Sequence, residues 1–577
     1  MSRLWGYLRR YRGRYAAGAL ALLLTATMAM AIPYLLKRAV DSAALGHGAQ
    51  VVQFALLVVV IAIAQAVART FSRALIFNVG RDVEYDLRND LFAHLLRLPV
   101  SYYRRNPTGD VMSRLVNDVT AVRMVLGPGV LNLINTPLYY AYGLAIMCQL
   151  DAWLTVLALS PYPVLLGVVK FLSRRLMEGT LRVQEGLAGL AALVQENVSG
   201  AHIVRAHAAE EIEIERFRKA NDSFQSVSVE LARIRGRLFP LMRLASGAGS
   251  LVVLWYGGYL VIRNQLTVGD LVAFLGYLNL LAWPTMALGW ILSVFQRGRA
   301  AMRRLEEILS LEPTIAEAPR PISPREVRGE VEFRNVTFAY PGRERTPALR
   351  ELNLRIPARA LVAIVGRTGA GKTTLAALVP RLWDPISGTV HIDGHDLRSW
   401  PLSTLRRTVC VVPQDPFLFS ATLRENIAFA AEHASDDEIW RAVRLAGLEQ
   451  DLERLPRGLD TMVGERGVLL SGGQKQRVTL ARALLSPAPI VVLDDPLSSV
   501  DAETERRILE GLLPVLRERT TILISHRLST VRYADTIVVL ERGRVVEVGR
   551  HDQLLMRGGT YAALFRQQEL EEAIAAL

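Results

Sequence analysis

The chain has 577 residues, of which 51% are hydrophobic, and its formal net charge is +13. This length predicts more than one domain, and a mean hydropathy of +0.23 beside an ordinarily charged second half argues against a uniformly water-soluble chain. The two cysteines, Cys148 and Cys410, lie too far apart in sequence for a metal-binding motif or a disulfide framework. We expect both to be small buried residues.

The positive charge has two explanations. Nucleic-acid binding is one, because an excess of lysine and arginine is typical of proteins that bind the phosphate backbone. The other is that loop arginines orient membrane helices, as the positive-inside rule describes. The arginines cluster beside apolar segments, so we favour the second explanation and predict no nucleic-acid partner.

Six uncharged segments in the first half are long enough to cross a bilayer, which needs about 17–25 residues. Arginines precede the first segment, as in a signal peptide. That segment is longer than the apolar region of a signal peptide, and a second one follows it closely, so we interpret it as a retained helix. The six segments are residues 16–36, 51–68, 124–150, 152–169, 244–262 and 271–296.

The connections between these segments are unequal. Residues 37–50 and 263–270 are short, whereas residues 69–123 and 170–243 are long, polar and rich in arginine. The positive-inside rule places the long connections and the N-terminus in the cytoplasm. We therefore expect a multi-pass protein of the inner (cytoplasmic) membrane that contacts membrane lipid.

The long connections do not have the composition of loops. Residues 82–98 carry leucines at helical spacing, which predicts one apolar helical face formed by Leu87, Leu91, Leu95 and Leu98. We expect these connections to be helices that continue out of the membrane into water.

Polar residues inside the predicted spans have two interpretations. They could line a substrate pathway, or they could form the hydrogen bonds between helices that are common in membrane bundles. For any single residue we favour the second interpretation. The residues are Asn132, Asn135, Asn279 and Gln296.

A phosphate-binding motif follows the membrane half. Residues 312–327 contain several prolines and are predicted to be a linker between a transmembrane domain, residues 1–311, and a nucleotide-binding domain, residues 328–577. An apolar strand over residues 361–365 precedes G-x-x-x-x-G-K-T, whose glycines let backbone N–H groups point at phosphate oxygens. The predicted ATP-binding residues here are Gly366, Thr368, Gly369, Ala370, Gly371, Lys372, Thr373 and Thr374.

Two carboxylates end a second apolar strand. In a nucleotide hydrolase such a strand delivers one carboxylate to Mg²⁺ and the next to the attacking water. Asp494 is the predicted Mg²⁺ ligand together with Thr373, and Asp495 is the predicted catalytic residue. The water-side position usually needs the reach of glutamate, and Asp495 is one methylene shorter.

Further motifs give the chain a family resemblance. The sequence Leu-Ser-Gly-Gly-Gln at 470–474 resembles the signature of ATP-binding-cassette (ABC) proteins. Other segments are similar to the adenine-stacking aromatic, the Q-loop, the X-loop, the D-loop and the switch histidine of the same family. In that order they contain Tyr340, Gln414, residues 464–467, Asp501 and His526.

The resemblance covers almost the whole chain. Six spans ahead of a cassette are similar to a half-transporter of the type IV ABC exporters. The implied fold is an all-α six-helix transmembrane domain followed by an α/β P-loop domain. The resemblance also implies short coupling helices near residues 102–107 and 207–211 that dock on the cassettes.

The same resemblance implies how the nucleotide is held. Two cassettes sandwich ATP, which one phosphate loop and the signature of the other cassette bind together. Gln414 and His526 are expected to act with Asp495 in catalysis, and Gln414 also near Mg²⁺. The residues expected to reach nucleotide from the signature and the D-loop are Ser471, Gly472, Gly473, Gln474 and Asp501.

Asp495 departs from the family pattern, which has glutamate at this position. A positioned general base is worth about 10²–10⁴-fold in rate. We therefore expect one subunit of a heterodimer whose own ATP site is slow and whose signature completes the site of its partner. The expected function is ATP-driven export of small amphipathic molecules, either drug-like or lipid-like. The alternatives are a homodimeric exporter or flippase, and an ATP-gated channel or regulator.

Overall fold

The computed structural model describes the backbone of residues 2–322, 324, 326–431, 433–464, 467 and 470–575. The chain forms two compact units. Unit 1 comprises Met1–Leu96 and Thr108–Leu311, and unit 2 comprises Arg97–Pro107 and Glu312–Leu577. Residues 97–107, which the sequence places in the transmembrane domain, group instead with the C-terminal unit.

Unit 1 is helical throughout its described residues. Its α-helices are α1 (Ser2–Arg10), α2 (Arg12–Ala44), α3 (Gly48–Leu95), α5 (Thr108–Ser113), α6 (Val119–Met124), α7 (Val130–Leu150), α8 (Ala152–Leu159), α9 (Pro161–Ser199), α10 (Ala201–Ala206), α11 (Glu210–Val252), α12 (Gly258–Ile262) and α13 (Val268–Leu309). Three π-helical turns, Arg114–Asp118, Val125–Gly129 and Val253–Gly257, join some of them without a break.

Three of the described helices are long and apolar enough to cross a membrane by length and composition: α2, α3 and α13. They contain the first, second and sixth predicted spans. The other three predicted spans are divided between elements. Residues 152–169 fall on α8 and α9, which meet at Pro161 because proline has no N–H to donate and disfavours helix in the residue before it.

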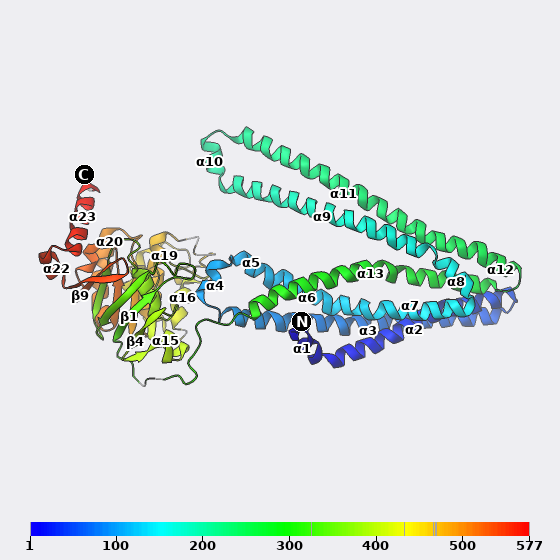
Figure 1. Cartoon of the computed structure of the whole chain (residues 1–577), viewed down its shortest axis with the longest axis horizontal. Coiled ribbons are helices and arrows are strands. Elements are labelled where there is room, and N and C mark those ends of the chain that lie inside the picture. Colours follow the sequence, from blue (N-terminus) through cyan, green and yellow to red (C-terminus); the bar gives the residue numbers. More distant parts are fainter. Residues whose placement is uncertain are drawn as a thin grey trace. The chain divides into compact units, whose positions relative to one another are not determined.

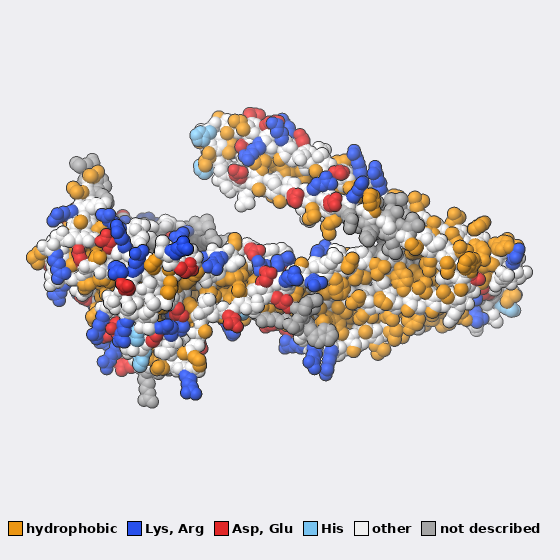
Figure 2. All heavy atoms as spheres, in the orientation of Figure 1, with side chains coloured by type: hydrophobic (Ala, Val, Ile, Leu, Met, Phe, Trp, Pro, Cys, Tyr) orange, Lys and Arg blue, Asp and Glu red, His pale blue; other side chains and the backbone are white. Residues whose placement is uncertain are grey.

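The surface of unit 1 agrees with a membrane location. Hydrophobic side chains gather over the part of this unit formed by α2, α3, α7 and α12, and charged side chains gather elsewhere on it (Figure 2). On α3 the exposed side chains include Leu56, Val60, Ile63 and Val67. Burial of such side chains in water-free lipid is favourable, so this face suits hydrocarbon.

The predicted helical extension of the second span is confirmed. α3 continues without interruption to Leu95, and Leu87, Leu91 and Leu95 are all buried. α9 and α11 pack against each other along their lengths and diverge from the other helices of unit 1 toward α10 (Figure 1).

Polar contacts fasten the helix ends of unit 1. Lys37 on α2 forms an ion pair with Asp270 on α13. The backbone N–H of Gly269 donates to the Asp41 carboxylate over 3.0 Å. Asn132, expected to bond between helices, donates instead to the Pro128 carbonyl of its own chain turn at 2.8 Å. Asn197 on α9 makes the same kind of bond, to the Leu193 carbonyl four residues earlier at 3.0 Å.

Unit 2 contains two sheets. A four-stranded antiparallel sheet has the order β2-β1-β4-β5, formed by β1 (Val331–Phe338), β2 (Leu349–Ile356), β4 (Ser387–Ile392) and β5 (His395–Asp396). A six-stranded sheet has the order β10-β9-β3-β8-β7-β6. Its strands are β3 (Leu361–Val365), β6 (Val409–Val412), β7 (Ile490–Asp494), β8 (Thr520–Ile524), β9 (Thr536–Glu541) and β10 (Arg544–Gly549).

Helices cover the sheets of unit 2 (Figure 1). They are α4 (Val100–Arg105), α14 (Lys372–Leu378), α15 (Leu402–Thr408), α16 (Leu423–Ile427), α17 (Asp436–Leu445), α18 (Glu449–Glu453), α19 (Gly472–Leu485), α20 (Ala502–Arg517), α21 (Leu528–Val531), α22 (His551–Arg557) and α23 (Thr560–Ala575).

The larger sheet is the core of unit 2. All residues of β3, β7 and β8 are buried, as expected for parallel strands covered on both faces. Along β3, Leu361, Ala363 and Val365 pack into one apolar cluster, whereas Val362 and Ile364 pack into another. Strands β6, β7, β8, β3 and β9 are parallel neighbours, so their carboxyl ends meet at one edge. In open α/β sheets this edge is where ligands bind.

Candidate functional site

The loop after β3 is closely packed on two neighbouring backbones. Gly366, Gly369 and Gly371 all have positive φ angles, at 154°, 83° and 103°. A Cβ on Gly366 would lie 2.3 Å from the carbonyl oxygen of Leu540, and one on Gly371 would lie 2.6 Å from that of Ala348. Glycine is therefore required at both positions by packing as well as by conformation.

Lys372 places a positive charge inside this loop. Its ammonium donates to the carbonyls of Gly366 at 2.7 Å and Arg367 at 3.2 Å, and only 6% of the residue is exposed. Burial lowers the pKa of Lys372, while the carboxylates of Asp495 and Asp494 act in the opposite direction. A buried cation among inward-curled N–H groups fits a polyphosphate.

Asp494 ends β7 and is almost fully buried. Burial raises its pKa, and the hydrogen bond from the Thr373 side chain acts against that rise. The predicted pair of Thr373 and Asp494 is thus together at the edge of the sheet. A hydroxyl and a carboxylate are the kind of oxygen ligands that a hard divalent cation prefers.

Asp495 and His526 come from adjacent parallel strands. Asp494 pairs with Ile524 in the register of β7 and β8, so the residues that follow each strand face each other. The backbone N–H of His526 donates to Asp495 Oδ1 at 2.9 Å, and His526 Nε2 lies 3.3 Å from Asp495 Oδ2.

The backbone of Asp495 is also unusual. Its φ is +47°, in the left-handed region that few residues other than glycine adopt, and its own N–H donates to the Ile524 carbonyl at 2.9 Å. Strained conformations of this kind persist only where the surroundings enforce them. Here both carboxylate oxygens and the N–H bind the segment that carries His526.

A cavity of about 280 Å³ brings three of the predicted catalytic residues together. Gln414, which follows β6, lines it beside Asp495 and His526. The rest of its wall comes from the segment after Asp495, from α20 and from the segment after β8, through Pro496, Leu497, Ser498, Glu505, Leu509, Ser525, Arg527 and Thr530.

Tyr340 lies at the edge of the same unit, near the loop. Its hydroxyl and the Thr374 hydroxyl are 3.1 Å apart, and its ring makes edge contacts with Phe338 and Trp383. The guanidinium of Arg104 on α4 lies 5.1 Å from the ring centroid. The first predicted coupling segment therefore contacts the predicted adenine-stacking residue, which the sequence did not indicate.

The signature segment begins α19. Ser471 caps this helix, because its hydroxyl accepts from the Gln474 N–H at 3.3 Å and its N–H donates to the Gln474 side chain at 2.9 Å. Ser471 and Gly472 are exposed. A 14-residue helix with a capped, exposed N-terminus presents free N–H groups and a partial positive charge to solvent.

The segment 498–501 packs directly against this helix. A Cβ on Gly473 would lie 2.8 Å from the Ser499 carbonyl oxygen. Gln476 donates to the Ser498 hydroxyl at 2.7 Å and accepts from the Ser499 N–H at 2.8 Å. Asp501 is occupied in capping α20, since its carboxylate accepts from the Thr504 N–H at 2.9 Å.

Glu505 and Arg527 complete this arrangement, and sequence reasoning missed both. Arg527, next to His526, donates to the Val500 carbonyl at 2.9 Å and forms an ion pair with Glu505. Glu505 is 5% exposed and also accepts from the Thr530 hydroxyl at 2.5 Å. The segment 498–501 is thus held by α19 on one side and by the His526 segment on the other.

Of the predicted X-loop, Glu465 and Arg466 lie outside the described residues. Gly467 is described and has a φ of +72°. A Cβ there would lie 3.1 Å from the Lys475 side chain of α19. The structure thus places the end of this loop against the signature helix.

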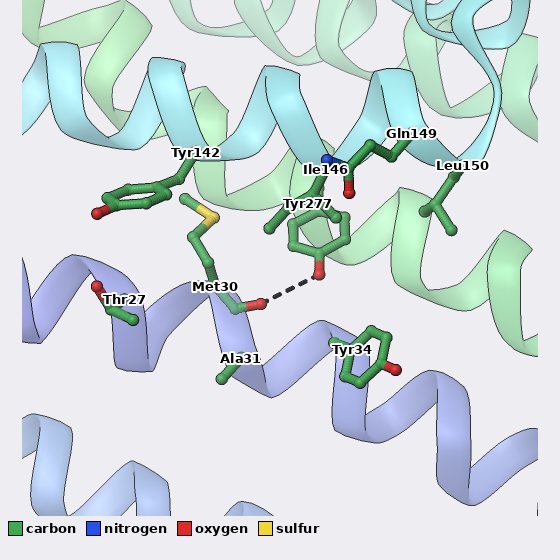
Figure 3. Close-up of a pocket in the computed structure, with 9 residues that line it drawn as sticks. All are labelled: Thr27, Met30, Ala31, Tyr34, Tyr142, Ile146, Gln149, Leu150 and Tyr277. Carbon is green, nitrogen blue, oxygen red and sulfur yellow. Dashed lines mark hydrogen bonds between the residues drawn. The ribbon is translucent and has the colours of Figure 1, made fainter.

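Unit 1 contains a second cavity, of about 450 Å³, between α2, α7 and α13 (Figure 3). α2 contributes residues from its middle and α7 from its last turns, while Tyr277 lies in the third turn of α13. None of the lining residues carries a charge. They are Thr27, Met30, Ala31, Tyr34, Tyr142, Ile146, Gln149, Leu150 and Tyr277.

These features define a class of protein. A parallel sheet whose carboxyl edge holds a glycine loop, a buried lysine, paired aspartates and a histidine is a P-loop ATPase fold, and here it follows a helical membrane unit. The family model for the ABC transporter transmembrane region matches residues 15–285, and that for the ABC transporter cassette matches residues 349–498.

Known proteins resemble the chain over nearly its full length. The "ATP-dependent lipid A-core flippase" of Syntrophus aciditrophicus is 34% identical over 99% of this chain and 95% of its own length. The "Multidrug resistance-like ATP-binding protein MdlA" of Escherichia coli is 34% identical over 98% of this chain and 96% of its own. A solved bacterial Atm1-family ABC exporter with ATP bound is 30% identical, with a TM-score of 0.79 over 97% of this chain and 98% of that one.

The chain therefore belongs to the ABC transporters, as an exporter with the membrane domain fused to the cassette. It is a multi-pass membrane protein with a cytoplasmic ATP-binding domain, and its ATPase is coupled to transport. The predicted fold class is confirmed.

Proposed function

We propose that this chain is one subunit of a heterodimeric exporter of amphipathic molecules, and that the ATP bound by its own phosphate loop is hydrolysed slowly. One observation carries the proposal. Both oxygens of the Asp495 carboxylate are engaged by His526, through its N–H at 2.9 Å and its ring at 3.3 Å. A carboxylate held in this way, and one methylene shorter than glutamate, is withdrawn by about 1.5 Å from the position of the usual base.

The residues of the phosphate loop fit ATP with Mg²⁺. Lys372 and the loop N–H groups would bind phosphate oxygens, Thr373 and Asp494 would hold the divalent cation, and Tyr340 would stack on the base. The bound cation would supply charge stabilisation for the leaving phosphates. Gln414 lies beside Asp495 in the 280 Å³ cavity, where it is placed to orient a water.

The signature serves the other site of the dimer. Ser471 and Gly472 are exposed at the start of α19, so they are free to bind the γ-phosphate of ATP held by the partner. In the partner we expect a glutamate after its Mg²⁺ aspartate. This chain then retains one ATP for a long time while the second site turns over.

The proposed substrates are small amphipathic molecules. The 450 Å³ cavity between α2, α7 and α13 supports this, because drug-sized sites of about 300–1,000 Å³ are mostly apolar with a few polar groups. Relatives named as a lipid A-core flippase and as a multidrug resistance-like protein agree with lipid-like or drug-like cargo.

Purification of the chain alone tests the assembly. We expect little ATP hydrolysis from it, measured by phosphate release in nanodiscs, and full activity only after a second half-transporter is added. A stable homodimer with brisk ATP turnover would instead support the rival assembly, in which Asp495 works well enough in two identical sites.

Substitution tests the reach of Asp495. In the complex, Asp495→Glu is expected to raise hydrolysis at this site at least about tenfold, because a correctly placed base is worth about 10²–10⁴-fold. Asp495→Asn is the matched control, since it keeps the size and removes the charge. Unchanged turnover in Asp495→Glu, with ATP still bound, would show that reach is not what limits this site.

An ATP-gated channel is the rival of a different class. Flux into sealed vesicles separates the two. An exporter moves a probe against its gradient only when ATP is hydrolysed, whereas a channel lets it move down its gradient when ATP is merely bound.

A further inference from the structure

The cavity of unit 1 has polar groups at several places along its wall (Figure 3). Met30, Ile146 and Leu150 are apolar, whereas Thr27 and Tyr142 bring hydroxyls and Gln149 brings an amide (Figure 3). The Tyr277 hydroxyl is already used, since it donates to the Met30 carbonyl at 3.1 Å. Tyr34 adds a further hydroxyl on the side of the cavity away from Tyr142 and Thr27 (Figure 3).

The Tyr34 hydroxyl is hydrogen-bonded to an arginine. Arg38 lies one turn further along α2, and its guanidinium is 5.4 Å from the Tyr34 ring centroid. Its Nε and Nη2 both donate to the Tyr34 hydroxyl oxygen, at 3.2 and 2.8 Å. Because that oxygen accepts from arginine, the hydroxyl keeps its own proton to donate to another acceptor. At this end of the cavity the Tyr34 hydroxyl is a hydrogen-bond donor, and the positively charged Arg38 guanidinium lies next to it.

The neighbouring charged groups at the ends of α2 and α13 also have partners of their own. Lys37 forms an ion pair with Asp270. Asp41 accepts from the Gly269 N–H at 3.0 Å. Among the described residues, Arg38 is the charged group that bonds directly to a cavity-lining residue, and none of the lining residues supplies a carboxylate to receive a cation.

We propose that this cavity selects anionic amphiphiles: Arg38 and the Tyr34 hydroxyl receive a phosphate or carboxylate headgroup, and the apolar wall receives its hydrocarbon. The selection rests on the proposed export function, because it names the charge class of the exported molecule. A lipophilic cation would meet the like charge of Arg38, whose exposed guanidinium lies at the rim of the cavity. A lipid headgroup and a free organic anion share the required chemistry.

A different explanation of Arg38 is structural. Arginine and tyrosine at the end of an apolar helix commonly anchor it at the membrane interface. The chain contains a matched pair of this kind outside the cavity. Arg263 lies 4.6 Å from the ring centroid of Tyr259 at the end of α12, and neither residue lines the cavity. Arg263 therefore controls for anchoring and for surface charge.

Binding of matched fluorescent probes to the full-length protein in nanodiscs, without ATP, tests the proposal. The probes are dansyl-labelled undecanoate, the dansyl-labelled trimethylammonium of equal chain length, and a dansyl-labelled lysophosphatidate. We expect the anions to bind at least about tenfold more tightly than the cation. Arg38→Gln should abolish that preference, Arg38→Lys should keep most of it, and Arg263→Gln should leave it unchanged.

Several results would overturn the proposal. One is equal affinity for the cation and the anions. Another is an equal loss of the preference in Arg263→Gln. If Arg38→Gln fails to fold, Tyr34→Phe replaces it and should weaken only the anions, about threefold; a loss that is equal for all probes contradicts the assignment.

The probes also distinguish a lipid headgroup from a free organic anion as the ligand. Binding of lysophosphatidate alone supports a lipid headgroup, and binding of both anions supports anionic amphiphiles in general. The binding readout needs no transport. Anion-selective binding without ATP-driven flux would refute the export function alone, and flux without charge selectivity would refute this inference alone.

Discussion

The two cavities of this chain are built on opposite principles. The cavity beside Asp495 includes four ionisable residues, Asp495, Glu505, His526 and Arg527, held by strand ends and short hydrogen bonds. The cavity in unit 1 has no charged lining residue and is formed by the faces of three long helices. Chemistry in the first depends on individual bonds, whereas recognition in the second depends on shape and on one charge at its rim. Substitutions should therefore act very differently in the two places.

The largest expected effect is that of Glu505→Ala in the cassette. The Glu505 carboxylate is nearly buried, and each of its oxygens has a partner: Arg527 for one and the Thr530 hydroxyl for the other. Removal of one partner of a buried pair costs about 3–5 kcal/mol, and we expect about 3 kcal/mol because the Arg527 side chain is 33% exposed. Denaturant unfolding of the purified protein measures the change.

The surface pairs of Arg424 with Asp436 and Asp460 provide the control for Glu505. Arg424→Ala should cost less than about 1 kcal/mol. Equal effects of the two substitutions would show that the contacts around Glu505 are no stronger than ordinary surface pairs.

Lys372→Ala comes next. Loss of a buried ammonium that binds phosphate should lower ATP affinity at least about a hundredfold, since hydrogen bonds to charged groups contribute about 1.5–3 kcal/mol each. Equilibrium binding of a fluorescent ATP analogue measures it. Arg334→Ala removes an exposed cation from β1 of the same unit and should change the affinity by less than about twofold.

Gly473→Ala tests the close packing of α19 on the segment 498–501. The added Cβ would lie 2.8 Å from the Ser499 carbonyl, and overpacking of this kind costs about 1–3 kcal/mol. Gly472→Ala is the matched control, because its Cβ would meet Ser499 at an ordinary 3.6 Å. Hydrogen exchange at Ser499 and Val500 should accelerate in the first variant only; identical exchange in both would contradict the contact.

The smallest effect is expected for Tyr277→Phe in unit 1. The Tyr277 hydroxyl donates one bond to the Met30 carbonyl, and loss of a single neutral hydrogen bond costs about 1 kcal/mol. Thermal unfolding in nanodiscs measures it. Tyr259→Phe, on an exposed tyrosine, should cost less. A loss as large as that of Glu505→Ala would remove the contrast between the two cavities.

The cassette was largely predictable because its function needs fixed residue types at fixed spacing. The loop at 366–374, Asp494 and the signature all lie where a strand or helix begins or ends, and local sequence marks such places. The contact of Asp495 with His526 was harder to predict from the sequence. It depends on the register of β7 against β8, which pairs Asp494 with Ile524 across about thirty residues of chain.

Other features could not be derived from local patterns. Glu505 sits on an amphipathic helix, where a carboxylate ordinarily faces water, and its burial follows only from Arg527 and Thr530. The cavity in unit 1 joins residues of α2, α7 and α13 that are more than a hundred positions apart. The break at Pro161, in contrast, falls on a residue that can kink or be tolerated in a membrane helix, and the predicted span over residues 152–169 ran through it.

The contacts of Asp495 also bear on how such a site can change over generations. Its nearly buried carboxylate accepts the His526 N–H at 2.9 Å. Exchange of glutamate for aspartate preserves an acceptor, whereas alanine would not. Mutational drift at position 495 is therefore confined to acids and amides as long as the fold is under selection, even if hydrolysis at this site is not.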